Sequence, residues 1–212
     1  MNIIKPSVEI IDMDDYSNIV KKIEKIGRVC YKSESNISDG SAERFISNIL
    51  KRGHESVIEH ESVTVRMVCD RGITHEIVRH RIASYSQEST RYCNYTNDKF
   101  GSEITVIDPA GGFEYDPDDE TDLARYNAWR EAMENAEKSY FKLLELGATP
   151  QEARSVLPNS LKTEIVVTMN LRSWRNFFRL RCDSHAHPQM REVAGIALEV
   201  FKERLPIFFS DL

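Results

Sequence analysis

One stretch of thirteen residues, 79–91, carries most of the side chains that are able to do chemistry. Guanidinium groups alternate there with an imidazole, hydroxyls and an amide, and the set is Arg79, His80, Arg81, Ser84, Ser86, Gln87, Ser89 and Arg91. Such groups on an irregular segment suit a phosphate or a nucleotide edge, because each charge-assisted hydrogen bond contributes on the order of 1.5–3 kcal/mol. A solvated loop whose arginines pair with acidic residues is the alternative interpretation.

The charge of the chain is unevenly distributed. The formal net charge of −6 disfavours a non-specific nucleic-acid binder, whose affinity comes from many contacts between basic side chains and phosphates. Residues 109–137 carry nine acids and two bases, a local charge of −7, whereas residues 154–181 carry six bases and one acid, a local charge of +5. Of the 28 basic residues 17 are arginine, which binds phosphate and carboxylate through paired hydrogen bonds. This gathering of arginine predicts a pocket for small anionic ligands.

Composition limits the architecture and the class of protein. A chain of 212 residues with 41% apolar content is enough for one core, so we expect a single domain over residues 1–212. Apolar runs such as residues 165–167 are far shorter than a membrane span, and the first residues lack a basic leader followed by an apolar segment. We therefore expect a cytoplasmic protein without a membrane partner. Four widely separated cysteines argue against a disulfide framework or a CxxC metal site.

The elements that must position the reactive side chains follow from the apolar pattern. The first half is expected to hold a strand at 8–13, helices at 19–30 and 45–50, a strand at 63–67, a helix at 73–79, a loop at 83–97 and a strand at 104–107. The second half is expected to hold a solvated acidic loop at 109–122, a long core helix at 126–144, a short helix at 150–156, a buried strand at 163–169, and helices at 173–181 and 190–201. This order predicts an α+β fold with a central twisted sheet flanked by helices.

Three ordered segments of the chain together resemble one enzyme family. Arg79-His80-Arg81, followed after seven residues by Ser89, resembles the RHR-x7-S signature of the flavin-dependent thymidylate synthases. Upstream, residues 53–60 resemble the family's GHE(S/T)xxEH segment, and downstream, residues 170–181 resemble its flavin-binding helix. The resemblance extends over residues 28–200.

The resemblance implies an enzyme that methylates dUMP to dTMP. The one-carbon unit would come from methylenetetrahydrofolate, and the reducing equivalents from NADPH through a bound FAD, with no metal. It also implies a homotetramer whose sites lie between subunits and whose partners are these small molecules, with no nucleic acid. All of these ligands are anionic, which agrees with the arginine clustering inferred independently from the charge distribution.

The resemblance also assigns residues to two ligands. The flavin is expected to contact Ser56, Arg79, His80, Arg81, Gln87, Asn170, Arg172 and Asn176. The nucleotide is expected to contact Glu76, Ile77, Val78, Arg79, Gln87, Glu88, Ser89, Thr90, Arg91, Arg154 and Arg181, with Arg154 coming from a neighbouring chain. On a helix Arg172, Asn176 and Arg179 share one face and Arg181 lies on another, so we predict that this helix serves two pockets.

Arg181, Ser89 and His54 are the predicted catalytic residues. Carbon 5 of uracil is a poor nucleophile, and a guanidinium beside N3 and its carbonyl would stabilise the ionised ring and raise the electron density at that carbon. Ser89 is expected to position the phosphate or orient the substrate. A nucleophilic serine is the alternative, although no GxSxG motif surrounds it. The family motif places His54 near the flavin ring and the nucleotide.

Histidines and cysteines are alternative candidates for metal binding or nucleophilic catalysis. Zinc is not expected at His54 and His60, which are six residues apart, because HExxH sites need histidines four apart on one helical face. His185 and His187 receive no role. Cys30 and Cys93 match no known nucleophile position and are interpreted as structural.

Two alternative functions and one local question stay open. An arginine-rich nucleotide- or RNA-binding module without flavin would use Tyr85, Tyr92 and Tyr95 as stacking surfaces. An interaction protein would dock its basic helix on an acidic partner. Glu76 stands where some family members have glutamine, and an ionised Glu76 near a phosphate is unfavourable unless Arg79 or a proton compensates.

Overall fold

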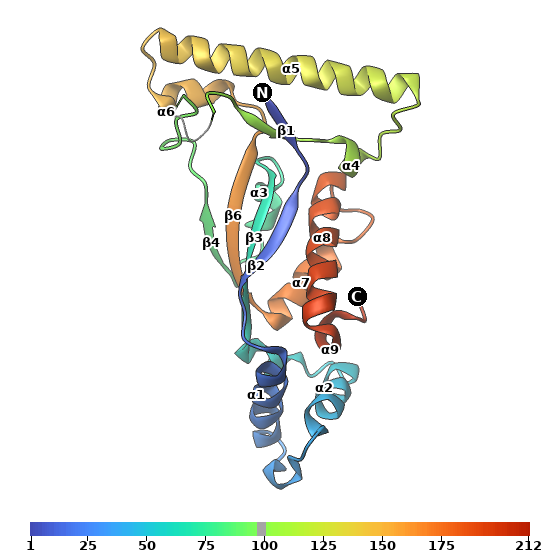
Figure 1. Cartoon of the computed structure of the whole chain (residues 1–212). Coiled ribbons are helices and arrows are strands. Elements are labelled where there is room, and N and C mark those ends of the chain that lie inside the picture. Colours follow the sequence, from blue (N-terminus) through green and yellow to red (C-terminus); the bar gives the residue numbers. More distant parts are fainter. Residues whose placement is uncertain (97–100) are drawn as a thin grey trace.

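The computed structural model describes residues 1–96 and 101–212. Within these residues an antiparallel sheet occupies the middle of the molecule, a helical arm extends from one end, and a smaller unit caps the other end (Figure 1). The loop predicted at 83–97 ends at Asn97, which lies outside the described residues.

The sheet has four strands in the order β2 (Ser7–Asp12), β3 (Ser62–Asp70), β6 (Lys162–Asn170) and β4 (Ser84–Gln87). β3 and β6 pair over their full length, from Ser62 with Asn170 to Asp70 with Lys162. Because side chains of a strand alternate between its two faces, Val63, Val65, Met67 and Cys69 of β3 share one face. That face is fully buried, and Thr64 and Arg66 lie on the opposite face.

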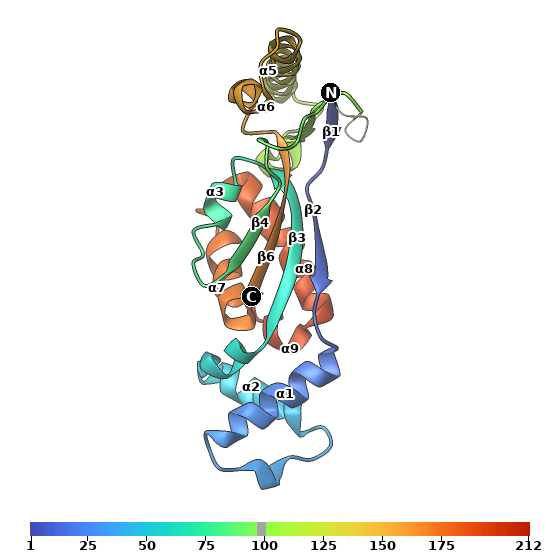
Figure 2. The same cartoon turned by 90° about the vertical axis from the view of Figure 1, so that its left-hand side faces the viewer.

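Helices cover the buried face of the sheet, and no helix covers its other face among the described residues (Figure 2). They are α7 (Leu171–Arg181), α8 (Pro188–Arg204) and α9 (Pro206–Phe209). α7 buries Trp174, Phe177 and Phe178 against this face, and the indole N–H of Trp174 donates a 3.1 Å hydrogen bond to the carbonyl of Val63. This aromatic packing fixes α7 to the sheet and leaves its opposite side exposed.

The helical arm precedes β3 and returns the chain to the sheet. It consists of α1 (Tyr16–Val29), η1 (Glu34–Asn36), α2 (Ser41–Lys51) and η2 (Glu55–His60). Inside the arm, buried Glu24 accepts hydrogen bonds from Arg28 and from the hydroxyl of Ser41. η2 contacts α7, so the arm brings its last turn beside the exposed side of that helix.

The smaller unit is assembled from segments far apart in sequence. It contains β1 (Asn2–Ile4), β5 (Thr105–Ile107), α4 (Ala110–Phe113), α5 (Glu120–Glu145), α6 (Pro150–Ala153) and η4 (Arg154–Val156). β1 pairs in parallel with β5, and α5 lies across the end of the molecule (Figure 1). A second hydrophobic cluster lies beneath α5 and contains Tyr95, Ile104, Val106, Met133, Tyr140, Ala153 and Leu161.

The structure is a mixed α/β fold with a sheet flanked by helices, as predicted. η1, η2 and α9 are additional to the expected elements, and four further differences concern β4, β1, α4 and α5. Residues 84–87 form β4 inside the predicted loop, because β6 pairs with them. β1 was not predicted. α4 interrupts the predicted acidic loop, and α5 buries only Met133 and Tyr140 among its described residues, so it is an amphipathic cover and not a core helix.

α4 packs closely on the first turn of α8. A Cβ atom on Gly112 would lie 2.9 Å from the Cα of Gln189, and one on Gly111 would lie 2.2 Å from Oε1 of Glu192. The absence of a side chain at both glycines therefore permits this contact. No helix of the described residues has the length and apolarity that crossing a bilayer requires.

Candidate active site

A cavity of about 720 Å³ lies between α7, η2 and the segment that follows α3 (Thr74–Ile77). Seven predicted site residues line it, and they are Arg79, His80, Arg81, Asn170, Arg172, Asn176 and Arg181. Sequence reasoning placed Arg179 on the same helix face as Arg172 and Asn176, and it lines the cavity too. It missed the other lining residues, which are Glu55, Glu59, Ile82, Ser173 and Leu180. Arginine-bearing segments that are about one hundred residues apart in sequence thus converge on one site.

α7 is positioned by the residue that ends β6. The side-chain oxygen of Asn170 accepts a 2.8 Å hydrogen bond from the backbone N–H of Ser173 and so caps the helix. The cap leaves the NH₂ group of Asn170 available at the cavity. Arg172, Asn176 and Arg179 then follow at helical spacing on the exposed side of α7.

The two pockets predicted along α7 stay a prediction, and within this chain both ends of the helix reach one cavity. Arg172 and Arg181 line the same cavity, although they leave the helix on different faces. Arg181 reaches this cavity because Glu76 and His80 hold its guanidinium on that side. These partners lie on a different segment, and the sequence did not indicate them.

Five of the described residues that line the cavity are arginines, and they differ in their partners. Arg172 pairs with Glu59, Arg179 pairs with Glu55 at 2.7 Å, and Arg181 pairs with Glu76 at 2.7 Å. The remaining two, Arg79 and Arg81, are exposed and form no ion pair with other described residues. An anion that enters the cavity therefore meets two unpaired guanidinium groups first.

Arg181 is held by three hydrogen bonds. Its Nε–H donates to Nε2 of His80 at 3.0 Å, one terminal nitrogen donates to the carboxylate of Glu76 at 2.7 Å, and the other donates to the carbonyl of Glu76 at 3.1 Å. Burial, and then the positive charge of Arg181, lower the pKa of His80 to about 4. The Glu76 question raised by the sequence is thus answered within the chain, because Arg181 compensates the carboxylate.

A buried ion network lies behind the wall formed by α7 and η2. The guanidinium of Arg175 is 1% exposed and binds both carboxylate oxygens of Asp211, at 2.7 and 2.6 Å, and Oε1 of Glu55 at 3.0 Å. Glu55 also binds Arg179. Burial opposes ionisation of Glu55, but hydrogen bonds from Arg179 and Arg175 outweigh it and lower its pKa. The network fixes η2 to α7.

The predicted nucleotide residues of the loop 87–91 do not line this cavity. The amide nitrogen of Gln87 lies 3.2 Å from the hydroxyl of Thr74 and 3.3 Å from that of Thr163, so it is directed into the sheet. Glu88 pairs with Lys162 at 3.1 Å beside a separate cavity of about 400 Å³.

Arg154 was expected to come from a neighbouring chain, but within this chain its guanidinium already donates to the hydroxyl of Thr90 at 3.3 Å. Thr90 belongs to the loop 87–91. Arg154 and this loop therefore form one group, which is separate from the 720 Å³ cavity.

Three other predicted residues lie outside the lining of the main cavity. Ser56 is exposed on η2, and Nδ1 of His54 is hydrogen-bonded to the hydroxyl of Tyr31 at 2.8 Å. The hydroxyl of Ser89 accepts a 3.3 Å hydrogen bond from the backbone N–H of Arg91, and no described histidine binds it. This arrangement does not support a serine nucleophile.

The stacking surface required by the RNA-binding alternative is not formed. Tyr95 is buried in the second hydrophobic cluster, and the hydroxyl of Tyr85 lies within hydrogen-bond distance of the carbonyls of Ile77 and His80. Of the three tyrosines only Tyr92 is exposed. Among the described residues, no group of three or more His, Cys, Asp or Glu side chains could hold a metal ion.

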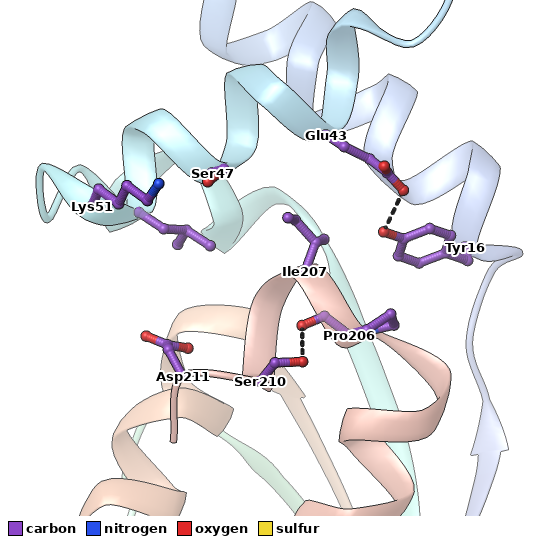
Figure 3. Close-up of a pocket in the computed structure, with 9 residues that line it drawn as sticks. Tyr16, Glu43, Ser47, Lys51, Pro206, Ile207, Ser210 and Asp211 are labelled. Atoms are coloured by element: carbon purple, nitrogen blue, oxygen red, sulfur yellow. Dashed lines mark hydrogen bonds between the residues drawn. The ribbon is translucent and has the colours of Figure 1, made fainter.

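A further cavity of about 570 Å³ lies between the helical arm and the segment around α9 (Figure 3). It is lined by Tyr16, Glu43, Ser47, Leu50, Lys51, Pro206, Ile207, Ser210 and Asp211. The hydroxyl of Tyr16 donates to Glu43 at 2.8 Å at one side of it. None of the predicted site residues belongs to this lining, so the 720 Å³ cavity is the candidate active site.

Comparison with known proteins gives consistent matches along most of the chain. Residues 12–207 match the family model described as thymidylate synthase complementing protein. A flavin-dependent thymidylate synthase of Pyrococcus furiosus is 37% identical over 174 residues, which cover 82% of this chain and 68% of the relative. That of Geobacter sulfurreducens is 35% identical over 191 residues, which cover 87% and 78%.

A solved structure shares the fold. The UMP/dUMP methylase PolB from Streptomyces cacaoi, bound with 5-Br dUMP, superimposes with a TM-score of 0.81 and 23% sequence identity. The match covers 99% of this chain and 96% of that chain. The architecture described above, including α5 and the helical arm, is therefore that of a known fold.

Proposed function

This chain belongs to the flavin-dependent thymidylate synthase family and is an enzyme of this type, and from that premise we propose that it methylates dUMP to dTMP. Methylenetetrahydrofolate supplies the carbon, and NADPH supplies the reducing equivalents through a bound FAD. The observation that carries the proposal is the convergence of Arg79, Arg81, Arg172 and Arg181 on one cavity. A cytoplasmic location stays a prediction from the sequence.

The lining of the cavity fits a flavin dinucleotide. Its volume of about 720 Å³ lies in the range of ligand sites, and its two unpaired arginines suit a diphosphate. Ile82 and Leu180 are 76% and 54% exposed at the same cavity, so an apolar ring that covered them would remove apolar surface from water. We propose that Arg79, His80, Arg81, Asn170, Arg172 and Asn176 hold the flavin.

When bound, the flavin supplies the reducing equivalents of the reaction. Arg181 belongs to the cavity lining, is 19% exposed, and stabilises the negative charge that develops on the uracil ring. His80 stays neutral and holds the Nε–H of Arg181. The backbone of the segment 76–79 borders the nucleotide on the same side.

The second group of nucleotide residues supports a proposal that the site is shared between subunits. Gln87, Glu88, Ser89, Thr90, Arg91 and Arg154 belong to the group that lies apart from the main cavity in one chain. We propose that the loop 87–91 and Arg154 of a neighbouring copy complete the cavity in a homotetramer. Ser89 and Arg91 would then contact the phosphate, and His54 and Ser56 would approach the flavin across the interface.

The visible absorbance of the purified protein is the first test. Yellow protein, or protein that becomes yellow with added FAD, is expected to form dTMP only when dUMP, methylenetetrahydrofolate and NADPH are all present. Colourless protein that FAD does not reconstitute would overturn the proposal. Arg130→Ala, on α5 and away from the cavity, is the matched control for loss of an arginine.

A further inference from the structure

Glu76 is the residue that most restricts Arg181. Its carboxylate and its own backbone carbonyl accept from the two terminal nitrogens of the same guanidinium, at 2.7 and 3.1 Å. Since these two acceptors belong to one residue on the short helix α3, they fix the plane of the guanidinium as well as its position. The Glu76 side chain is 32% exposed and that of Arg181 is 19% exposed. Arg181 lines the cavity, whereas Glu76 contacts Arg181 without belonging to the lining.

Hydrogen bonds also hold α3, the short helix that carries Glu76. Asp70 accepts a 2.9 Å hydrogen bond from the backbone N–H of Ile73, and the hydroxyl of Thr74 donates to the carbonyl of Arg71 at 2.8 Å. Gln87 lies 3.2 Å from that hydroxyl. α3 is thus tied to the end of β3 and to β4, so Glu76 presents its acceptors from a fixed backbone.

The Arg181 guanidinium has N–H groups that no described residue accepts from, and these are available to a ligand. A guanidinium carries five N–H groups in a rigid plane and accepts nothing. The Nε–H is directed to His80, and one N–H on each terminal nitrogen is directed to Glu76. One N–H on each terminal nitrogen therefore remains available, in an orientation that Glu76 sets.

We propose that Glu76 is a positioning residue whose carboxylate fixes the orientation of Arg181, and that it does not contact the substrate through this carboxylate. The inference rests on the proposed function, because it assigns the two remaining N–H groups of Arg181 to the uracil ring. It predicts that residue 76 orients Arg181 through a side chain long enough to accept its hydrogen bond, and that the negative charge of this side chain is not required.

Three variants separate reach from charge. Glu76→Gln keeps the length of the side chain and an oxygen that accepts from Arg181, but it removes the charge. Glu76→Asp keeps the charge but is one CH₂ shorter, so its carboxylate falls short of the terminal nitrogen. Glu76→Ala removes both. Glu134→Ala, which breaks an exposed ion pair with Arg130 on α5, is the control for loss of a glutamate.

The measurements are kcat and KM for dUMP with flavin-saturated enzyme, together with flavin content, thermal midpoint and the affinity of the oxidised holoenzyme for dUMP. We expect Glu76→Ala and Glu76→Asp to lower kcat about 10- to 100-fold, since small displacements of a catalytic group have effects of this size. KM, flavin content and dUMP affinity should stay within about threefold of the wild type, and Glu76→Gln should keep wild-type kcat within about threefold.

Other outcomes reject the inference. If Glu76→Gln is as impaired as Glu76→Ala while Glu76→Asp is active, the charge acts and not the position. If all variants raise KM at constant kcat, Glu76 contacts the substrate. Wild-type kcat in Glu76→Ala rejects it directly. If the wild type itself forms no dTMP, the proposed function fails, and the variants are then compared by dUMP affinity. A loss of affinity of more than about threefold in Glu76→Ala contradicts the inference.

Discussion

The Nε–H of Arg181 donates to Nε2 of His80 across 3.0 Å, and this direction fixes the state of the imidazole. A guanidinium has no lone pair to offer, so Nε2 must carry the acceptor lone pair and the ring proton must be on Nδ1. Phe177 contacts the same ring edge-on, with 5.0 Å between centroids. His80 is therefore held neutral between a cation and an apolar face, and protonating it would place two positive charges together.

The neutral His80 predicts a loss of stability in mild acid. Its pKa is lowered from 6.5 to about 4 in the folded protein, so the unfolded chain binds more protons between these values. The contribution is complete above about pH 6.5 and disappears as the pH falls towards 4, and it amounts to at most about 3 kcal/mol. Urea unfolding of the wild type and of His80→Asn at several pH values checks this.

His185 provides the control for this pH dependence, because its side chain is 94% exposed. His185→Asn should follow the wild-type curve, whereas His80→Asn should lose the acid-dependent part. A wild-type stability that is flat between pH 4 and 6.5 contradicts the assignment of a neutral His80.

Asp211 is predicted to stabilise the wall of the cavity from behind. Asp211→Asn replaces one of the two carboxylates on buried Arg175, which leaves Glu55 as its anionic partner among the described residues, beside the carbonyl of Phe208. We expect a loss of about 2 kcal/mol in the free energy of unfolding, because hydrogen bonds to charged groups contribute about 1.5–3 kcal/mol. Glu199→Gln, in an exposed pair with Lys202, should change it by less than about 0.5 kcal/mol. Equal effects of the two variants would count against the network.

Substitutions of two arginines of α7 are expected to have different effects on flavin binding and on kcat. Arg172→Ala should lower flavin retention in the purified protein, because Arg172 faces the cavity from the first turn of the helix. Arg181→Ala should retain flavin and lower kcat about 100- to 1,000-fold, as for loss of an electrostatic stabiliser. Absorbance per protein and dTMP formation are measured in parallel, with Arg130→Ala as the control. Equal loss of flavin in both α7 variants would refute separate roles.

The contact between α4 and α8 gives a matched pair of glycine variants. Gly112→Ala would place a Cβ 2.9 Å from the backbone of Gln189, which is unable to move aside, so we expect a loss of about 1–3 kcal/mol. Gly195→Ala lies within α8 and meets nothing within 4 Å, so the higher helix propensity of alanine should stabilise it by about 0.5–1 kcal/mol. We expect the thermal midpoint of Gly112→Ala to lie below that of the wild type and the thermal midpoint of Gly195→Ala to lie above it.

The sequence predicted the elements whose pattern is local. Alternation in β3 and β6 and the apolar spacing of α1, α7 and α8 were visible because each of these elements buries one face. β4 was missed because Ser84 and Ser86 carry no strand signal, and the pairing with β6, far along the chain, decides its conformation. β1 is three residues long and likewise depends on a distant partner.

The candidate site was predicted in part for a related reason. Arginines, amides and one histidine were identified by type and motif, and the structure brings seven of these residues to one cavity. Glu55 and Glu59 were not predicted as site residues, because their role depends on which arginines α7 places opposite η2. The loop 87–91 was expected at the same site, but its cavity within one chain is a different one.

The separate hydrophobic cluster beneath α5 has a consequence for the exchange of backbone amide hydrogens with solvent. The cluster shares no described residue with the one that supports α7, and its strands β1 and β5 pair over only three positions. Opening this unit therefore exposes fewer buried apolar residues than opening the larger cluster would, and it leaves the long β3–β6 ladder intact. Amides of β1 and β5 should become deuterated well before those of β3, β6 and α7. The smaller unit can therefore open transiently while the cavity keeps its shape.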